Sequence, residues 1–376
     1  MRQSLLVIAC LLASSIAAAA LPVPKPPSID ARGYLLIDFG SGRVLAEKNA
    51  DQRLEPASLT KLMTAYGVFK ALAEKRLRID EEVLISENAW RAEGSRTFVQ
   101  VGTRVPVEVL IKGMIVQSGN DATIALAERV GGSESGFVQM MNTYAQALGM
   151  KETRFENSPG MPSPMHYTTA RDVAKLTRAL IREFPEYYRW YSIQEFTWNG
   201  IRQPNRNGLL VRDSTVDGVK TGHTESAGYC LVTSARRDNM RLVAVVMGSS
   251  SMRSREDASA TLLNYGYTFF QTARIKGRGE TVLSPRLFKG TEKFVAIGPR
   301  QDVYVTVARG EAANLKTVAR AFEPVVAPAP RTRAVGELIV KLGEEIVAKA
   351  PLYPIKDAPE GGLWRRMADG VSLWWQ

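Results

Sequence analysis

Three short motifs hold the side chains that are best suited to chemistry. They are Ser58-Leu59-Thr60-Lys61, Ser118-Gly119-Asn120 and Lys220-Thr221-Gly222, in that order along the chain. Each motif alone is weak, because such short patterns arise by chance in many proteins. Their occurrence together is a much stronger indication, and it points to a serine nucleophile that is activated by lysine.

Ser58 follows Pro56-Ala57 and begins a predicted helix, whose free N–H groups and positive dipole end would lie beside its hydroxyl. It could be an N-cap, or a nucleophile with a backbone N–H helping to hold an oxyanion. Lys61 lies one turn later on the same face. A buried lysine, or one beside another cation, can be neutral and accept the serine proton. We expect Lys220 to be that cation if the fold brings it near.

The other two motifs have chemical and structural interpretations as well. Ser118-Gly119-Asn120 lies between helical stretches, where a hydroxyl can relay a proton and the Asn amide can hold a substrate carbonyl. The alternative is helix capping. On an edge strand, Lys220 and Thr221 would offer a cation and a hydroxyl to a carboxylate, and Gly222 would leave room for the substrate backbone. The alternative there is a solvated turn.

Other kinds of active site have little support. The chain has two histidines, His166 and His223, and neither lies in a nucleophile-elbow context. No His, Cys or Glu pair has the spacing of metal ligands. We therefore expect no metal and no cofactor.

The N-terminus predicts export. Arg2, the apolar run Leu5–Ile16 and the small residues Ala17–Ala20 have the form of a secretory signal peptide, cut near Ala20. A buried N-terminal helix is the alternative. A net charge of +11 suits an anionic partner, and export argues against nucleic acid. Since we discount Cys10 as a lipoprotein cysteine, Cys230 would be alone in the mature chain, without a disulfide.

The remaining sequence predicts two folded units and a tail. Strands and helices alternate in the first unit, and Ala258–Phe270 reads as its last helix. From Lys276 the chain predicts a small all-β domain with no long helix between Glu280 and Pro354. The other expected strands of the first unit are 34–38, 44–47, 228–235 and 242–247, and its other expected helices are 59–77, 107–115, 121–130, 137–148 and 170–182. In the β domain, Val303, Val305 and Val307 alternate with polar residues, and 293–297, 315–319 and 338–340 are further expected strands.

Residues 363–376 predict an amphipathic helix with one apolar and one polar side. At about 1.5 Å per residue it is too short to span the hydrocarbon core, but it can lie in the membrane interface. The alternative is a terminal helix docked on its own protein. The apolar side comprises Leu363, Trp364, Met367, Val371, Trp374 and Trp375, and the polar side comprises Arg365, Arg366, Asp369, Ser372 and Gln376.

The sequence resembles the low-molecular-mass penicillin-binding proteins, the D-alanyl-D-alanine carboxypeptidases. The resemblance rests on 56–64, 117–122 and 217–224, which contain the three motifs, and on 205–210. It covers nearly the whole chain. It implies an α+β catalytic domain of the β-lactamase/penicillin-binding fold, in which an antiparallel sheet has helices on both sides and a helical subdomain. A small all-β domain and a C-terminal amphipathic helix follow.

The resemblance also implies roles for individual residues. Ser58 would attack the carbonyl between two D-alanines, Lys61 would be its base, and Ser118 and Asn120 would complete the proton path and the substrate grip. The Ser58 and His223 N–H groups would form the oxyanion hole. The implied substrate-binding residues are Lys220, Thr221, Gly222, His223, Arg255 and, in a supporting role, Arg206.

The family interpretation fixes the expected organisation and partners. We expect a signal peptide at 1–20, a catalytic domain at 21–275, a β-rich domain at 276–360 and a membrane-anchor helix at 361–376. The expected partners are peptidoglycan stem peptides, β-lactam antibiotics and a membrane surface. The expected location is the periplasmic side of the cytoplasmic membrane, with peripheral anchoring.

Three alternative functions stay open. A β-lactamase commonly has Asp where this chain has Gly119, and it uses a deacylating Glu for which we find no clear candidate. A non-enzymatic β-lactam sensor would be expected to have transmembrane segments. A D,D-endopeptidase or transpeptidase would act on the same peptides and differ in its acyl acceptor.

Overall fold

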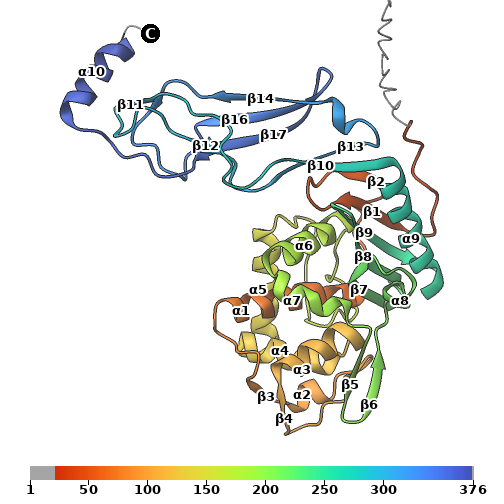
Figure 1. Cartoon of the computed structure of the whole chain (residues 1–376). Helices are drawn as coiled ribbons and strands as arrows, with labels where there is room; N and C mark the ends of the chain where they lie inside the picture. The colour runs from red at the N-terminus through yellow and green to blue at the C-terminus, as the bar shows by residue number, and fades with distance from the viewer. Residues whose placement is uncertain (1–21, 375–376) are drawn as a thin grey trace, which may run out of the picture.

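A computed structural model of the chain describes residues 22–374. The predicted signal peptide therefore lies outside the described residues. Figure 1 shows a larger unit of mixed strands and helices, and an elongated β-rich unit with helix α10 (Leu363–Trp374) at its far end. This architecture confirms the predicted fold class, including the small β domain and the terminal helix.

The larger unit is built on a five-stranded antiparallel sheet with the order β2-β1-β9-β8-β7. The three-residue motif at 220–222 lies on β7, which is an edge strand as expected. The strands are β1 (Gly33–Asp38), β2 (Val44–Lys48), β7 (Val216–Thr224), β8 (Gly228–Arg237) and β9 (Met240–Ser249).

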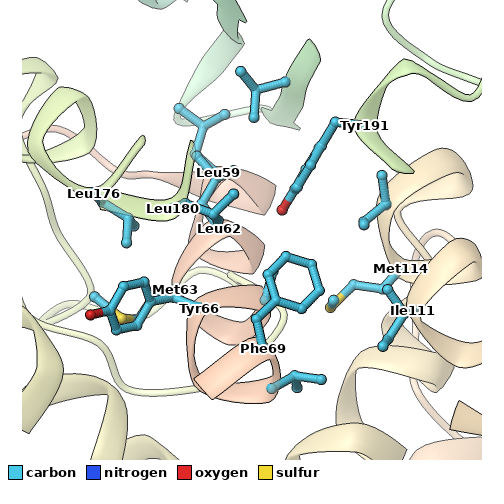
Figure 2. Close-up of a cluster of buried hydrophobic side chains, with 14 of the residues drawn as sticks. Leu59, Leu62, Met63, Tyr66, Phe69, Ile111, Met114, Leu176, Leu180 and Tyr191 are labelled. Atoms are coloured by element: carbon cyan, nitrogen blue, oxygen red, sulfur yellow. The ribbon is translucent and has the colours of Figure 1, made fainter. Parts of the chain in front are cut away.

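The sheet separates two hydrophobic cores because successive strand residues point to opposite faces. In β9, Leu242, Ala244 and Val246 enter the core beneath α9 (Met252–Phe269), and the alternate residues enter the other core. That second core contains α6 (Ala170–Glu183) and α1 (Lys61–Ala73). Figure 2 shows the α1 side chains in it. Helices therefore cover both faces of the sheet.

The sequence suggested that the nucleophile motif begins the long helix, but it does not. Ala57–Thr60 form a 3₁₀ turn, η1, and α1 starts only at Lys61. Helix α9 starts six residues earlier than expected, because Ser251 caps it by accepting a hydrogen bond from the Ser254 N–H. The first turns of α9 are polar, so the apolar periodicity that predicted the helix did not include them.

A helical subdomain lies below the sheet in Figure 1. The helix expected at 107–115 ends at Lys112 and continues as a π-helical segment, η2 (Gly113–Gln117), which stops at Ser118 with φ = 65°. The subdomain contains α2 (Glu87–Trp90), α3 (Val107–Lys112), α4 (Asn120–Gly131), α5 (Glu134–Ala147) and the strand pair β3 (Glu82–Leu84) and β4 (Arg104–Pro106). Between α6 and β7 lie α7 (Pro185–Tyr188), η3 (Arg189–Ser192), β5 (Glu195–Trp198), β6 (Ile201–Pro204) and α8 (Leu209–Arg212).

The second unit is a β structure whose largest sheet has the order β12-β17-β16-β14. The strand expected at 293–297 is wrong in part: only Ile297 belongs to a strand, and Lys293 and Phe294 are exposed. Between 280 and 354 the helical structure is a 3₁₀ turn, η4 (Ala312–Asn314). The strands are β10 (Phe270–Lys276), β11 (Leu287–Phe288), β12 (Ile297–Gly298), β13 (Val303–Ala308), β14 (Leu315–Ala321), β15 (Val325–Val326), β16 (Gly336–Leu342) and β17 (Glu345–Pro354).

A polar network joins the two units. The buried Asp38 carboxylate accepts hydrogen bonds from the Ser41 N–H (2.6 Å) and from the Thr272 hydroxyl (2.8 Å). The Thr306 hydroxyl contacts both the Ser41 and the Thr272 hydroxyls, at 2.6 and 2.9 Å. Arg43 donates to the Thr306 carbonyl at 2.6 Å. Since buried, fully bonded polar groups are costly to separate, this network fixes one unit against the other.

Helix α10 contacts the β unit through its polar side. Asp369 accepts from the Lys289 N–H (2.7 Å) and pairs with Arg286 (3.1 Å), and Arg365 donates to the Thr291 carbonyl (2.8 Å). The apolar side faces outward, with exposed fractions of 84% for Trp364 and 60% for Met367. The helix is therefore docked on its own protein, which was the expected alternative, but through its polar side, so that its apolar side stays exposed. Trp375 and Gln376 lie outside the described residues.

Candidate active site

The three motifs meet at one cavity of about 730 Å³ in the larger unit. Turn η1, the loop before α4 and strand β7 each contribute to its wall. Lys61 and Lys220 are buried behind this wall. The predicted residues that line it are Ser58, Ser118, Asn120, Arg206, Thr221, Gly222, His223 and Arg255.

Ser58 lies on a constrained turn and does not cap a helix. Neither η1 nor α1 has a side-chain cap hydrogen bond. The preceding residue, Ala57, has φ = 47°, a left-handed conformation that costs an L-residue free energy. Such strain is common where a backbone must present a functional group. The capping role is therefore wrong, and the hydroxyl stays available to the cavity.

The Lys61 amine has three neighbours at hydrogen-bond distance. They are Asn120 Oδ1 (2.7 Å), the Pro159 carbonyl (2.7 Å) and Ser58 Oγ (3.0 Å). A protonated amine donates to all three. A neutral amine has two N–H groups and one lone pair, and the two stronger acceptors, which can only accept, take both N–H groups. The lone pair then faces Ser58 Oγ, as a general base requires.

Burial first, and then the positive charge of Arg206, lower the pKa of Lys61 to about 7, against the opposing effect of the Asp121 carboxylate. Arg206 is thus one neighbouring cation of Lys61. Lys220, the cation expected from the sequence, also interacts with Lys61, and their mutual repulsion contributes to the Lys220 pKa. That pKa lies well below its ordinary value, first through burial and then through the charges of Lys61, Arg206 and Arg255.

Ser118 and Asn120 adopt different environments. The Ser118 hydroxyl is buried and has no hydrogen-bond partner among the described residues, although it lines the cavity. An unpartnered buried hydroxyl costs free energy and so marks a place where a ligand group is expected. Asn120 is bonded on both sides, through Oδ1 to Lys61 and through Nδ2 to the Glu93 carbonyl. Helix α4 has no side-chain N-cap, so neither residue is a capping residue.

Strand β7 presents Thr221 to the cavity and places Lys220 behind it, with the ammonium donating to the Thr221 carbonyl at 2.9 Å. Lys220, Thr221 and Gly222 lie on strand β7 and do not form the solvated turn that was the alternative. Gly222 also has a packing role that was not expected. A Cβ there would lie 3.1 Å from the Pro56 carbonyl and 3.3 Å from the Leu59 nitrogen, so the glycine admits η1. The nucleophile turn is therefore one reason for its small size, and the room expected for the substrate backbone stays a prediction.

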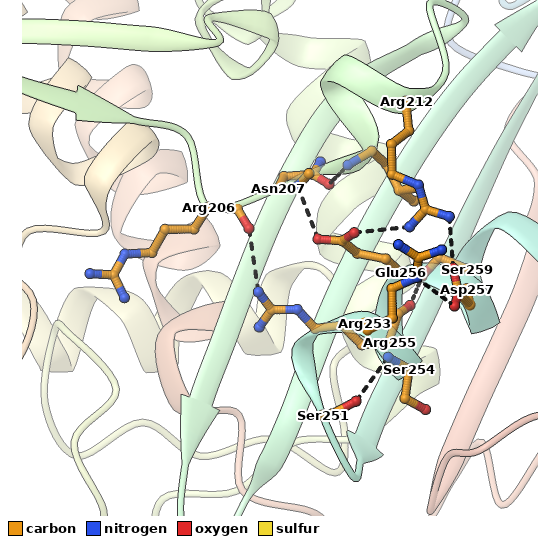
Figure 3. Close-up of polar contacts among 12 residues, drawn as sticks. Arg206, Asn207, Arg212, Ser251, Arg253, Ser254, Arg255, Glu256, Asp257 and Ser259 are labelled. Carbon is orange, nitrogen blue, oxygen red and sulfur yellow. Dashed lines mark hydrogen bonds and ion pairs between the residues drawn. The ribbon is translucent and has the colours of Figure 1, made fainter.

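Two arginines and a histidine complete the wall. Arg255 is buried and donates to the Gly222 (3.3 Å) and Arg206 (3.3 Å) carbonyls, while its Nε has no partner in the described structure. Figure 3 shows the Arg206 guanidinium pointing away from α9, on the side opposite the ion pairs of Arg212. Arg206 approaches Gln117 Oε1 at 3.4 Å. The His223 ring stacks on Tyr229 at 4.0 Å.

Sequence reasoning missed three contributors. The Pro159 carbonyl holds Lys61, and no local pattern identifies a backbone carbonyl 98 residues away. Tyr229 supports His223 and lies 5.7 Å beneath the Arg255 guanidinium. Asp121, the residue after the second motif, accepts the Thr97 and Phe98 N–H groups at 2.8 Å each. Its adjacency to Asn120 was the one available indication.

His166 is bound to groups other than Ser58. His166 is buried, its Nε2 lies 2.9 Å from the Thr60 hydroxyl, and its Nδ1 accepts from the Glu156 N–H. Burial lowers its pKa to about 4, so it is neutral at pH 7. Across residues 22–374, no three His, Cys, Asp or Glu side chains gather as metal ligands.

Comparison with known proteins shows similarity along nearly the whole chain. Residues 21–251 match the family model for D-alanyl-D-alanine carboxypeptidase, and residues 270–360 match the C-terminal domain of penicillin-binding protein 5. The chain is 41% identical to D-alanyl-D-alanine carboxypeptidase DacA of Escherichia coli, over 93% of this chain and 89% of the relative.

Solved structures agree with this similarity. Penicillin-binding protein 5 from Haemophilus influenzae superposes with a TM-score of 0.83 at 40% identity, covering 90% of this chain and all of the other. Penicillin-binding protein D2 from Listeria monocytogenes, solved in an ampicillin-bound form, covers 65% of this chain and all of its own. Its TM-score is 0.60 at 29% identity.

Proposed function

We propose a mechanism from one premise: this chain belongs to the peptidase S11 family and is a serine-type D-alanyl-D-alanine carboxypeptidase. The observation that carries the mechanism is the arrangement around Lys61. Its two protein acceptors take the N–H groups of the neutral amine and leave the lone pair for Ser58 Oγ. The low Lys61 pKa supports the same role.

The first half of the reaction is acylation. Ser58 Oγ attacks the carbonyl carbon of the D-Ala-D-Ala bond, and its proton passes to Lys61 Nζ. The oxyanion lies between the N–H groups of Ser58 and His223. The C–N bond then breaks, and the proton reaches the leaving amine through the Ser118 hydroxyl. Because that hydroxyl has no partner in the described structure, it is available to accept the proton from Lys61 and to donate its own to the amine when the substrate is bound.

The second half releases the shortened peptide. Water attacks the acyl-enzyme and gives its proton to Lys61, which passes it to Ser58 Oγ as the ester C–O bond breaks. Asn120 keeps Lys61 in place throughout. Because the same base serves both steps, the mechanism needs no separate deacylating carboxylate.

Recognition of the terminal carboxylate involves β7 and its neighbours. Thr221, Arg206 and Arg255 line the cavity, and Lys220 lies buried behind it, where a bound carboxylate would favour its ammonium form. Among these groups, Arg255 Nε is buried without a partner, which supports a role in holding an anion. β-Lactams would acylate Ser58 by the same attack, in line with the ampicillin-bound form of the Listeria relative.

The proposed organisation keeps the predicted boundaries: a signal peptide at 1–20, a catalytic domain at 21–275, a β-rich domain at 276–360 and an anchor at 361–376. We place the protein on the periplasmic side of the cytoplasmic membrane. The outward apolar side of α10 supports peripheral anchoring, and Asp369 binds the helix to the β domain. Within residues 22–374, no helix combines the length and apolar character needed to cross a bilayer.

The decisive experiment compares the wild-type chain with Ser58→Ala. We expect one D-alanine to be released per pentapeptide ending in D-Ala-D-Ala, together with a covalent penicillin adduct by mass spectrometry. Both should disappear in Ser58→Ala. Ser250→Ala, an exposed serine outside the cavity, is the matched control.

Other outcomes would identify the alternative functions. An adduct on Ser58→Ala would exclude the nucleophile. Rapid penicillin hydrolysis without D-alanine release would indicate a β-lactamase. A long-lived adduct without release would indicate a sensor or an endopeptidase.

A further inference from the structure

Three adjoining cavities lie at the junction of the two units, away from the active site. Their volumes are about 430, 360 and 480 Å³, and Arg300 lines all three. They share no lining residue with the catalytic cavity. Together they form one extended groove between the end of α6 and the loop that joins β12 to β13.

The groove is strongly basic. Five arginines line it, with Lys349 beside them and Asp302 as its single lining carboxylate. The Asp302 carboxylate is already paired, because it accepts hydrogen bonds from the Arg274 guanidinium (3.2 Å) and the Arg278 N–H (2.7 Å). The arginines are Arg178, Arg182, Arg278, Arg300 and Arg331.

Most of these cations have no carboxylate partner. Across the described chain, Arg178, Arg278, Arg300 and Arg331 form no ion pair, and Arg182 has only a 3.6 Å contact with exposed Glu183. Arg178 is half-buried and donates to the Phe39 carbonyl at 3.0 Å. Arg300 lies over the Tyr353 ring at 4.5 Å. Converging guanidinium groups without counter-charges repel one another, which an anion in the groove would relieve.

The groove also has a fixed shape. The Asp38 network and the Arg43 hydrogen bond to Thr306 hold the β1–β2 turn against β13, and that turn lines two of the cavities. Arg178 braces the same turn. A rigid site loses little conformational freedom when a ligand binds.

Position within the molecule favours one source of anions. Figure 1 shows α10 at the end of the β unit that is remote from the catalytic unit, whereas the groove lies at their junction. A bilayer that holds α10 is therefore not the natural partner of the groove. A polymer whose stem peptides each bear carboxylates can present them here, and the guanidinium fork matches carboxylate geometry.

We infer that the junction groove is a second binding site for peptidoglycan, which holds carboxylates of stem peptides other than the one being cleaved. This inference rests on the proposed function for the identity of the polymer. The site would keep the enzyme on the wall between successive cleavages. It would add nothing to the cleavage of a short soluble peptide, which is too small to reach both sites.

The test measures cosedimentation of the full chain with isolated peptidoglycan sacculi, in a Ser58→Ala background that prevents turnover. We compare Arg278→Gln/Arg300→Gln/Arg331→Gln with Arg104→Gln/Arg236→Gln/Lys316→Gln. The second set removes three exposed cations elsewhere and gives the same net charge. The groove variant should raise the apparent dissociation constant about tenfold, and the control should leave it nearly unchanged.

Two further measurements make the outcome decisive. Arg278→Lys/Arg300→Lys/Arg331→Lys keeps the charge and should recover part of the binding. Thermal unfolding checks that each variant is folded. Equal losses in the groove and control sets would overturn the inference, because net charge alone would then explain them. Loss of binding to anionic phospholipid vesicles with unchanged binding to sacculi would overturn it too.

The inference and the proposed function fail in different ways. With Ser58 present, D-alanine release from a soluble pentapeptide should be the same in the groove variant and in the wild type. If the wild type releases no D-alanine, the proposed function is wrong. If release is normal and sacculus binding is insensitive to the groove arginines, only the groove inference is wrong.

Discussion

At the scale of the residue, the motif predicted that Lys61 lies beside Ser58, but it did not identify the other groups that contact the lysine. The spacing of Ser58 and Lys61 predicted a shared helical face, and the two atoms lie 3.0 Å apart. The partners that orient the lysine lone pair, Asn120 and the Pro159 carbonyl, come from distant segments. Arg206, which also lowers the Lys61 pKa, was not expected in that role, since sequence order carries no information on which positive charges the fold brings together.

The rate of penicillin acylation should follow the ionisation of Lys61. With a pKa of about 7, the amine is protonated and inactive below that pH, so the rate should rise as pH increases through about 7. Arg206→Gln removes a positive charge that lowers this pKa. The acidic limb should therefore move to higher pH, by roughly half a unit or more.

Acylation rates between pH 5 and 9, measured at saturating penicillin, separate this effect from weaker binding. Arg104→Gln, an exposed arginine on β4, should leave the midpoint unchanged. An unmoved acidic limb in Arg206→Gln would contradict the assigned electrostatic role.

At the scale of the element, the sheet was predictable and the loops around the site were not. The continuous apolar run of β9 identifies a strand that is buried on both faces, whereas a 3₁₀ turn of four residues has no periodicity to detect. The loop at 93–99 is a similar case. It is held by a carboxylate on another element, which no pattern inside the loop reveals.

Asp121 should therefore matter for stability and for catalysis. Its fully buried carboxylate accepts the N–H groups of Thr97, Phe98 and Ala122 at 2.8 Å and of Val99 at 3.2 Å. Asp121→Asn turns an N–H₂ group towards these donors and should cost about 3 kcal/mol of unfolding free energy. Denaturant unfolding measures this cost.

The same substitution should also lower kcat at temperatures where the variant is folded, because the loop supplies the Glu93 carbonyl that holds Asn120. Asp80→Asn, an exposed carboxylate paired with Arg78, is the control and should change neither quantity. A stable, fully active Asp121→Asn would exclude the positioning role.

At the scale of the whole molecule, the tail illustrates a limit of helical periodicity. The pattern identified the two sides of α10 correctly but left open which side faces the protein. The contacts of Asp369 and Arg365 decide it, because they bind the polar side to the β unit.

Deletion of residues 363–376 should shift the protein from the membrane fraction to the soluble fraction. D-alanine release from short peptides should be unchanged, since none of the described tail residues, 363–374, lines the catalytic cavity. Trp364→Gln/Met367→Gln keeps the helix length and should weaken binding to phospholipid vesicles in the same direction. Unchanged membrane partition in the deletion variant would exclude the anchor.

The Asp38 network has a consequence for how far the enzyme reaches. Since it joins the catalytic unit rigidly to the β unit, and Asp369 fixes α10 to the other end, an anchored molecule has no flexible tether. The distance between Ser58 and the bilayer surface would then be fixed. Peptides in that thin layer of wall are trimmed, and those nearer to or farther from the membrane stay long.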